Sequence, residues 1–287
     1  MLLDGKALAI DIKEELAAQV GALKGRAPCL AVILVGDDPA SKIYVASKVH
    51  DCEKVGIHSI LENLPSSISE KDLLFQIERL NQDPKVDGIL VQLPLPDQIS
   101  QEAVIKAIDP NKDVDGFHPY NFGKIFSGDP SGFVPCTPAG IRELLLRYDI
   151  ETEGKEVVIV GRSHIVGKPM AGLLMQNGPG GNATVTIVHS KTKDLSLHTK
   201  RADILICSIG KPHFIKEEMV KEGAIVVDVG INRVIDETQP KGYRITGDVD
   251  FERVKDKCFA ITPVPGGVGP MTIAMLLKNT IKSRLSS

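Results

Sequence analysis

The feature that most constrains the fold of this chain is a series of short, almost unbroken apolar runs, separated by stretches long enough to be helices. The runs that we expect to form strands lie at residues 30–35, 88–93, 157–160, 184–188, 204–206 and 224–229. Strands that are buried on both faces of a parallel sheet carry this continuous apolar pattern. Their alternation with helices predicts an α/β protein of doubly wound architecture.

Two segments rich in glycine and proline interrupt this alternation, at residues 109–140 and 262–270. Segments of this kind cross between domains or form loops at a binding site. A last helix is expected at about residues 271–284, after Pro270, and we expect it to return to the first domain. A length of 287 residues fits one or two domains, and we expect two.

Charge and cysteine content narrow the function classes. The net charge is −3 and no basic run stands out, which argues against nucleic-acid binding. The five cysteines are widely spaced without a CxxC or Cys/His cluster, so we expect no metal site and free thiols in a reducing compartment. The N-terminus lacks the apolar core of a signal peptide, and no run approaches the roughly 20 apolar residues of a membrane span. We expect a cytoplasmic protein without membrane contact, although an organelle form with its leader removed fits as well.

A glycine turn follows the strand expected at 157–160. Gly161, Arg162 and Ser163 begin it, Gly167 ends it, and a helical pattern follows through Met175. A turn between a buried strand and a helix presents backbone N–H groups to a phosphate. The spacing differs from the G-x-G-x-x-G pattern, so an ordinary tight turn is the alternative. Its place after a buried strand favours a nucleotide site.

The next strand ends without the acidic residue that usually holds the ribose of NAD. His189, Ser190, Lys191 and Thr192 follow it instead. Together with Arg162, the serine and lysine are suited to a 2′-phosphate, which favours NADP over NAD. A polar strand end with a capping serine is the alternative.

Two further turns end predicted strands, at residues 208–212 and 228–232, and contain Gly210 and Ile231. Ligands bind at the carboxyl ends of strands in open α/β sheets. Ordinary turn chemistry explains the glycines equally well.

Residues 39–56 read as a helix in which Tyr44 and Lys48 are four residues apart and share a face beside an apolar stripe. A lysine on the edge of such a stripe is often only a packed stem with its charge in water. The Tyr-x-x-x-Lys pair of short-chain dehydrogenases follows the glycine turn, whereas this pair precedes it, so that assignment is rejected.

Gln92 ends the strand expected at 88–93, where its amide must find polar partners. Asp113 and Asp115 lie in the first glycine- and proline-rich segment. Two acids at this spacing commonly cap a loop, or they accept N–H groups from a polar heterocycle.

Six blocks along the chain resemble one family. They are 41–48 (SKIYVASK), 91–96 (VQLPLP), 112–117 (KDVDGF), 135–138 (PCTP), 161–163 with 166–169 (GRS and VGKP), and 262–272 (TPVPGGVGPMT). In these blocks and their order, the chain resembles the bifunctional methylenetetrahydrofolate dehydrogenase/cyclohydrolase family, the FolD proteins, over essentially its whole length. Two passages look longer than in the family, 176–182 and 234–246, and both read as surface turns.

The resemblance implies a folate enzyme with two activities. It would oxidise 5,10-methylenetetrahydrofolate to 5,10-methenyltetrahydrofolate with NADP⁺ and hydrolyse that product to 10-formyltetrahydrofolate. Residues 1–139 with 266–287 would form a folate-binding catalytic domain completed by the C-terminal helix. Residues 140–265 would form a Rossmann-type NADP-binding domain, and the protein would be a homodimer.

The resemblance also implies roles for individual residues. The catalytic group would be Lys48, with Tyr44 and Gln92 orienting it. The substrate would be held by Asp115, Pro265, Gly266, Gly267 and Pro270. The cofactor would be bound by Gly161, Arg162, Ser163, Gly167, Ser190, Gly210 and Ile231.

Three other functions would each explain only part of this sequence. A dehydrogenase without hydrolysis has no need of Tyr44, Lys48 and Gln92 together. A non-enzymatic NADP-binding sensor has little reason to retain Lys48, Gln92 and Asp115. An amino-acid-type dehydrogenase fits the Rossmann half but does not explain the block at 262–272.

Overall fold

The structure is a computed structural model that describes residues 1–239 and 242–286. The chain forms two compact units, one of Ile10–Cys136 with Ile273–Ser287 and one of Met1–Ala9 with Thr137–Thr272. We call them the N-terminal unit and the Rossmann unit and describe each by itself. Residues 1–9 and 266–272 fall in the Rossmann unit, whereas the domain bounds expected from the sequence place them in the catalytic domain. The expected domain bounds are defined by which ligand each domain binds, and they stay a prediction.

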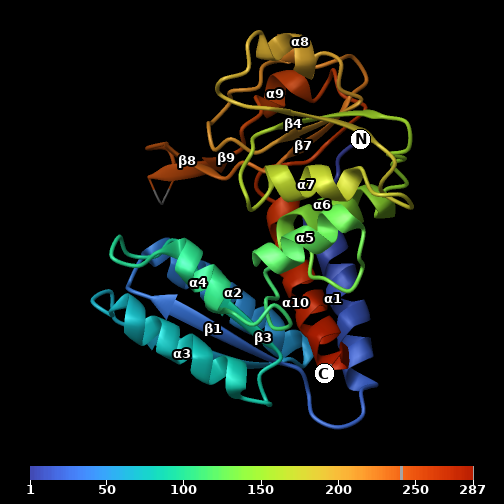
Figure 1. Cartoon of the computed structure of the whole chain (residues 1–287). Coiled ribbons are helices and arrows are strands. Elements are labelled where there is room, and N and C mark those ends of the chain that lie inside the picture. The colour runs from blue at the N-terminus through green and yellow to red at the C-terminus, as the bar shows by residue number, and fades with distance from the viewer. Residues whose placement is uncertain (240–241, 287) are drawn as a thin grey trace. The chain divides into compact units, whose positions relative to one another are not determined.

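The N-terminal unit is built on a three-stranded parallel sheet in the order β2-β1-β3 (Figure 1). The strands are β1 (Cys29–Val35), β2 (His58–Leu64) and β3 (Gly88–Val91). The helices are α2 (Pro39–Val55), α3 (Glu70–Gln82), α4 (Gln101–Ala107) and α5 (Pro119–Ser127), with most of α1 (Gly5–Gly21) and of α10 (Val268–Ser286). The central strand β1 is buried along its whole length, as its continuous apolar sequence requires.

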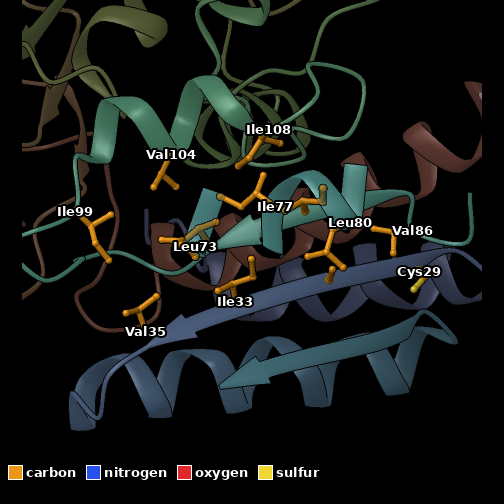
Figure 2. Close-up of a cluster of buried hydrophobic side chains, with 13 residues drawn as sticks. Cys29, Ile33, Val35, Leu73, Ile77, Leu80, Val86, Ile99, Val104 and Ile108 are labelled. Atoms are coloured by element: carbon orange, nitrogen blue, oxygen red, sulfur yellow. The ribbon is translucent and has the colours of Figure 1, made fainter. Parts of the chain in front are cut away.

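The core of this unit fills the space between the sheet and helices α3 and α4. On α3, Leu73, Ile77 and Leu80 recur at helical spacing and are at most 1% exposed. Figure 2 shows them opposite Ile33 of β1 and close to side chains of α4. Burying one such side chain contributes about 1.5–3 kcal/mol, so this layer fixes the sheet on which Gln92 and α2 are mounted.

The Rossmann unit contains a five-stranded parallel sheet in the order β10-β7-β6-β4-β5. The strands are β4 (Glu156–Val160), β5 (Thr184–Val188), β6 (Ile204–Cys207), β7 (Ile225–Asp228) and β10 (Ala260–Ile261). Its helical segments are α6 (Cys136–Arg147), α7 (Gly167–Leu174), α8 (Leu195–Thr199), α9 (Phe251–Val254) and the 3₁₀ turn η1 (Glu217–Met219). Residue Leu3 runs beside β10, where its N–H donates to Ile261 O at 2.9 Å.

The order of these strands creates a topological switch point. The chain places β5 on one side of β4 and then β6 on the other, so the strand order reverses beside β4. Ligands of open α/β sheets bind outside the carboxyl ends of the strands at such a switch point. A separate antiparallel pair, β8 (Asn232–Ile235) with β9 (Tyr243–Thr246), follows β7.

The doubly wound α/β class is confirmed, and each predicted strand is present within two residues of its expected bounds. One expectation about irregular segments was wrong, because residues 109–140 contain α5 and the start of α6. Residues 234–246 contain a turn at 237–238, as expected, but also the end of β8 and all of β9, which were not expected; 240–241 lie outside the described residues. The last helix begins at Val268, so Pro270 lies within its first turn. Within residues 1–239 and 242–286, no helix combines the length and apolarity needed to cross a membrane.

Candidate functional site

Lys48 and Gln92 meet in the N-terminal unit. Lys48 projects from α2, and its Nζ donates to Gln92 Oε1 at 3.0 Å. The amide Nε2 of Gln92 donates to Leu93 O at 2.7 Å, and the backbone N of Gln92 donates to Ile33 O at 2.9 Å. Gln92 is therefore fixed to the carboxyl end of the sheet, and its carbonyl holds the lysine there.

Tyr44 lies one turn before Lys48 on α2, and 44% of its surface is exposed. The stripe behind the pair is well packed, since Val45 is 2% exposed and Cys52 is fully buried. Among the described residues, the structure gives no hydrogen bond from the Tyr44 hydroxyl to Lys48 or Gln92. The structure thus joins two of the three predicted catalytic residues directly and leaves the tyrosine open to solvent.

Asp115 belongs to the same cluster. Burial raises the pKa of Asp115, while the positive charge of Lys48 and a hydrogen bond from Cys136 act in the opposite direction. The Sγ of Cys136 lies 3.3 Å from Val114 O and 3.8 Å from Asp115 Oδ1. Burial raises the pKa of Cys136 well above the usual thiol range, so the thiol is neutral and serves as a donor.

Asp113 has a different task from Asp115. Its carboxylate accepts from the N–H of Phe117 at 3.2 Å, from that of His118 at 2.8 Å and from Asn121 Nδ2 at 2.9 Å. Burial raises the pKa of Asp113 to about 7, and these hydrogen bonds oppose the shift. Of the two alternatives left open for the acid pair, loop capping describes Asp113, and for Asp115 a contact with a ligand stays a prediction.

Sequence reasoning missed the support of this loop by α10. Asn279 is 9% exposed, and its Nδ2 donates to Val114 O at 2.8 Å and to Val134 O at 3.1 Å. A polar residue among the apolar residues of the final helix indicates a buried hydrogen-bond partner. The sequence predicts Cys136 only as a free thiol and as part of the block at 135–138.

The glycine turn after β4 is closely packed. Gly161 has φ +130°, and a Cβ there would lie 2.3 Å from Ser208 O. A Cβ on Gly167 would lie 2.3 Å from Gly161 O, and Ser163 Oγ accepts from the Gly167 N–H at 3.4 Å. The Oγ of Ser208 is buried without a hydrogen-bond partner among the described residues. Because Gly161 and Gly167 have no side chains, the backbone of this turn at the switch point fits a turn that admits a dinucleotide phosphate.

Cationic and hydroxyl side chains are exposed in the segments that follow β4 and β5. Arg162, Ser190 and Lys191 are exposed. The segment after β5 is held in place because the His189 N–H donates to Thr192 Oγ1 at 2.9 Å and the Lys191 N–H donates to His189 Nδ1 at 3.2 Å. These side chains suit a phosphate at the ribose, so the residues present fit NADP.

Gly210 and Ile231 occupy neighbouring loops of the same sheet edge. Gly210 has φ +66° and donates its N–H to Asp248 Oδ2 at 3.0 Å. Ile231 is 51% exposed, and its Cδ1 lies 3.9 Å from the position of a Cβ on Gly269. Gly210 therefore lies in the loop after β6, the neighbour of β4, and Ile231 lies in the loop after β7, the next strand of the sheet.

The loop between β10 and α10 carries Pro265, Gly266 and Gly267. The carbonyl of Gly266 accepts from the Lys6 N–H at 2.7 Å, and the Gly267 N–H donates to Pro263 O at 2.9 Å. Pro270 follows in the first turn of α10. These predicted substrate residues lie in the Rossmann unit, whereas Lys48, Gln92 and Asp115 lie in the N-terminal unit.

Comparison with known families gives two matches, one in each half of the chain. Residues 3–115 match the model described as tetrahydrofolate dehydrogenase/cyclohydrolase, catalytic domain. Residues 135–287 match the model described as tetrahydrofolate dehydrogenase/cyclohydrolase, NAD(P)-binding domain. The two models together span most of the chain.

Individual relatives agree with these matches. The bifunctional protein FolD of Flavobacterium psychrophilum is 56% identical over 287 residues, which cover 99% of this chain and 97% of that protein. The solved FolD methylenetetrahydrofolate dehydrogenase/cyclohydrolase of Campylobacter jejuni is 54% identical, with a TM-score of 0.94 over 100% of this chain and 99% of that one. The enzyme of Trypanosoma brucei, solved with NADP cofactor and an inhibitor, is 38% identical, with a TM-score of 0.93 over 100% and 97%.

Proposed function

The chain belongs to the tetrahydrofolate dehydrogenase/cyclohydrolase family, and we propose that its two activities share one substrate site. It is an NADP-dependent oxidoreductase that converts 5,10-methylenetetrahydrofolate to 5,10-methenyltetrahydrofolate, and a hydrolase that converts this product to 10-formyltetrahydrofolate. The observation that supports a shared site is the Lys48–Gln92 hydrogen bond, with the charge of Lys48 acting on Asp115 in the same unit.

The oxidation depends on alignment. NADP⁺, held by the turn with Gly161, Ser163 and Gly167, would supply the acceptor for a hydride from the methylene carbon, and a ring nitrogen of the folate would stabilise the resulting cation with its lone pair. In our proposal, Asp115 accepts N–H groups of the pterin, and the loop with Pro265, Gly266 and Gly267 covers the folate. Holding two reactants in register lowers a barrier by up to about 7–11 kcal/mol, so this step needs no general base.

The hydrolysis needs proton transfer, which we assign to Lys48. The oxygen of a water molecule bonds to the methenyl carbon while Lys48, in its amine form, takes a proton from that water. The bond between this carbon and one of its two ring nitrogens then breaks while the added hydroxyl loses its proton to solvent and becomes the formyl C=O. The released nitrogen takes back the proton that Lys48 had accepted. Gln92 Oε1 holds Lys48 Nζ for this task. A positioned acid–base group contributes about 10²–10⁴-fold.

The remaining proposals concern binding, domains and assembly. We assign the cofactor phosphates to the turn with Gly161, Ser163 and Gly167, and the 2′-phosphate to Arg162 and Ser190. Residues 1–139 with 266–287 form the folate-binding catalytic domain and residues 140–265 the NADP-binding domain, in the bounds expected from the sequence. We further propose a cytoplasmic homodimer that binds neither membranes nor nucleic acid. The five free cysteines support a reducing compartment, and light scattering of the purified protein tests the dimer.

A spectrophotometric assay tests the function. Purified protein is given methylenetetrahydrofolate and NADP⁺, and the appearance of methenyltetrahydrofolate is followed. In a second cuvette, the decay of added methenyltetrahydrofolate is compared with and without enzyme. Both rates are expected to depend on enzyme. Formation without enzyme-dependent decay would leave a monofunctional dehydrogenase, and binding of NADP⁺ with neither rate would leave a sensor.

A further inference from the structure

Two buried carboxylates lie beneath the loops at the ligand-facing edge of the Rossmann sheet. Asp228 ends β7, and Asp248 lies in the segment between β9 and α9. They are 3% and 0% exposed, respectively. Buried carboxylates without a cationic partner are rare, because removing their charge from water is costly unless hydrogen bonds compensate. Neither residue belongs to the cofactor set expected from the sequence.

Asp248 binds the loop that follows β6. Its Oδ2 accepts from the N–H groups of Ile209 at 2.7 Å and Gly210 at 3.0 Å. Its Oδ1 accepts from the Lys211 N–H at 2.9 Å and from Asn232 Nδ2 at 3.0 Å. Three successive backbone amides thus converge on one carboxylate, and Asn232 connects the same carboxylate to the loop after β7.

Asp228 binds the segment that carries Asp248. Its carboxylate accepts from the N–H groups of Gly230, Asp248 and Val249, each at 2.9 Å. Its own N–H donates to Thr262 Oγ1 at 2.8 Å, at the start of the loop between β10 and α10. Burial raises the pKa of Asp228 to about 6 against the effect of these hydrogen bonds, so the carboxylate is retained here at a cost in free energy.

Two glycines leave the space that these carboxylates fill. A Cβ on Gly230 would lie 2.3 Å from Asp248 Oδ1, and a Cβ on Gly247 would lie 1.8 Å from Asp228 Oδ2. Both carboxylates therefore lie directly against the backbone. The loops after β6, β7 and β10 are joined through one connected set of hydrogen bonds.

We propose that Asp248 and Asp228 are positioning residues for NADP binding, because they fix the loops after β6 and β7 at the switch-point edge of the sheet. The inference rests on the proposed function in that Gly210 and Ile231, in these loops, are assigned to the cofactor site. Both oxygens of Asp248 accept only from N–H groups. The conformation of the loop after β6 therefore depends on two acceptor oxygens at this position, which a carboxylate supplies.

The test is Asp248→Asn, which keeps the shape of the side chain but turns an NH₂ group toward two N–H donors. Leaving buried donors unsatisfied is expected to distort residues 209–211 and to raise the KM for NADP⁺ about tenfold or more. The hydrolysis of added methenyltetrahydrofolate, which needs no NADP⁺, is expected to keep its kcat within about twofold. Asp250→Asn is the matched control, since the half-buried Asp250 pairs with Lys216 at 3.1 Å; the KM of this variant for NADP⁺ is expected to stay unchanged.

Direct calorimetric titration with NADP⁺ separates this inference from the proposed function. A wild-type protein that binds NADP⁺ but turns over no folate would refute the function, and the affinity of Asp248→Asn would still decide the inference. An unchanged NADP⁺ affinity in folded Asp248→Asn overturns it, as does an equal loss of both activities, which indicates general destabilisation. If Asp248→Asn does not fold, Asn232→Ala removes one donor to Oδ1, and a roughly threefold weaker NADP⁺ affinity is expected; an unchanged affinity counts against the inference.

Discussion

Replacing Gly5 by alanine tests the close contact between the start of α1 and the loop that we assign to folate. A Cβ on Gly5 would lie 2.0 Å from Gly267 O, and Cβ contacts under 3.0 Å are essentially absent from real proteins. The loop must therefore move by about 1 Å, against the hydrogen bond from Lys6 N to Gly266 O at 2.7 Å. Gly21, at the other end of the same helix, has no atom within 4 Å of its Cβ position and supplies the control.

The two variants are expected to change stability in opposite directions. Overpacking at Gly5 costs about 1–3 kcal/mol, which lowers Tm by roughly 2–5 °C in a chain of this size. Gly21→Ala removes backbone freedom from the unfolded chain and is expected to raise Tm slightly. A displacement of about 1 Å at a substrate loop can reduce kcat/KM by on the order of 10²-fold. Calorimetric melts and kcat/KM for methylenetetrahydrofolate measure both effects.

The clear refutation is a Gly5→Ala protein that melts and turns over like Gly21→Ala. That result would mean that α1 and the loop separate without loss, so the contact does not hold the loop. A lower Tm with unchanged kcat/KM would keep the packing argument and remove the loop from the folate site.

Three further predictions concern other parts of the molecule. Lys48→Met is expected to slow the hydrolysis of methenyltetrahydrofolate about 10²-fold or more while part of the hydride transfer remains. Equal loss of both activities in a folded variant would contradict the assignment of Lys48 to the hydrolysis alone. Arg162→Ala is expected to weaken NADP⁺ binding about tenfold and NAD⁺ binding little, by calorimetry, and an unchanged preference would remove Arg162 from the 2′-phosphate site. The pKa of Asp113 is raised by burial from 3.8 to about 7, so the folded protein binds the extra proton and its stability falls as pH rises between these values. Relative to Asp113→Asn, the wild type should gain about 2–3 kcal/mol of unfolding free energy in urea titrations between pH 8 and pH 5; a difference independent of pH would show that Asp113 titrates normally.

The parallel strands were predictable because burial on both faces leaves a continuous apolar sequence, as in β1 and β4. The strand β2 was missed because it lies at the edge of its sheet and mixes exposed and half-buried residues, including Glu62. Helix α5 was missed within a segment rich in Gly and Pro. Its end signals were nevertheless present, with Pro119 at its start and Gly128 in a left-handed conformation after its end.

Candidate site residues could be selected from the sequence where a local pattern marks them, as with Lys48 or the glycine turn, and their roles stay a prediction. The supports of the site could not be selected in this way, because Asp248 and Asn279 find their partners at distant points of the chain. No local spacing connects Asn279 to Val114, and Asp248 looks like one more polar residue near a turn. Hydrogen-bond partners of this kind depend on tertiary structure alone.

The pairing of Leu3 with Ile261 has a consequence for synthesis on the ribosome. Leu3 is fully buried in the finished protein, and its N–H bond to Ile261 O joins the first residues to the last strand of the Rossmann sheet. Translation at about 5–20 residues per second leaves roughly 10–50 s between these two residues. During that interval, residues 10–136 can collapse around their own sheet while Leu3 has no partner strand. Residues near Leu3 thus leave the ribosome long before Ile261 and are among the last to reach their final contacts.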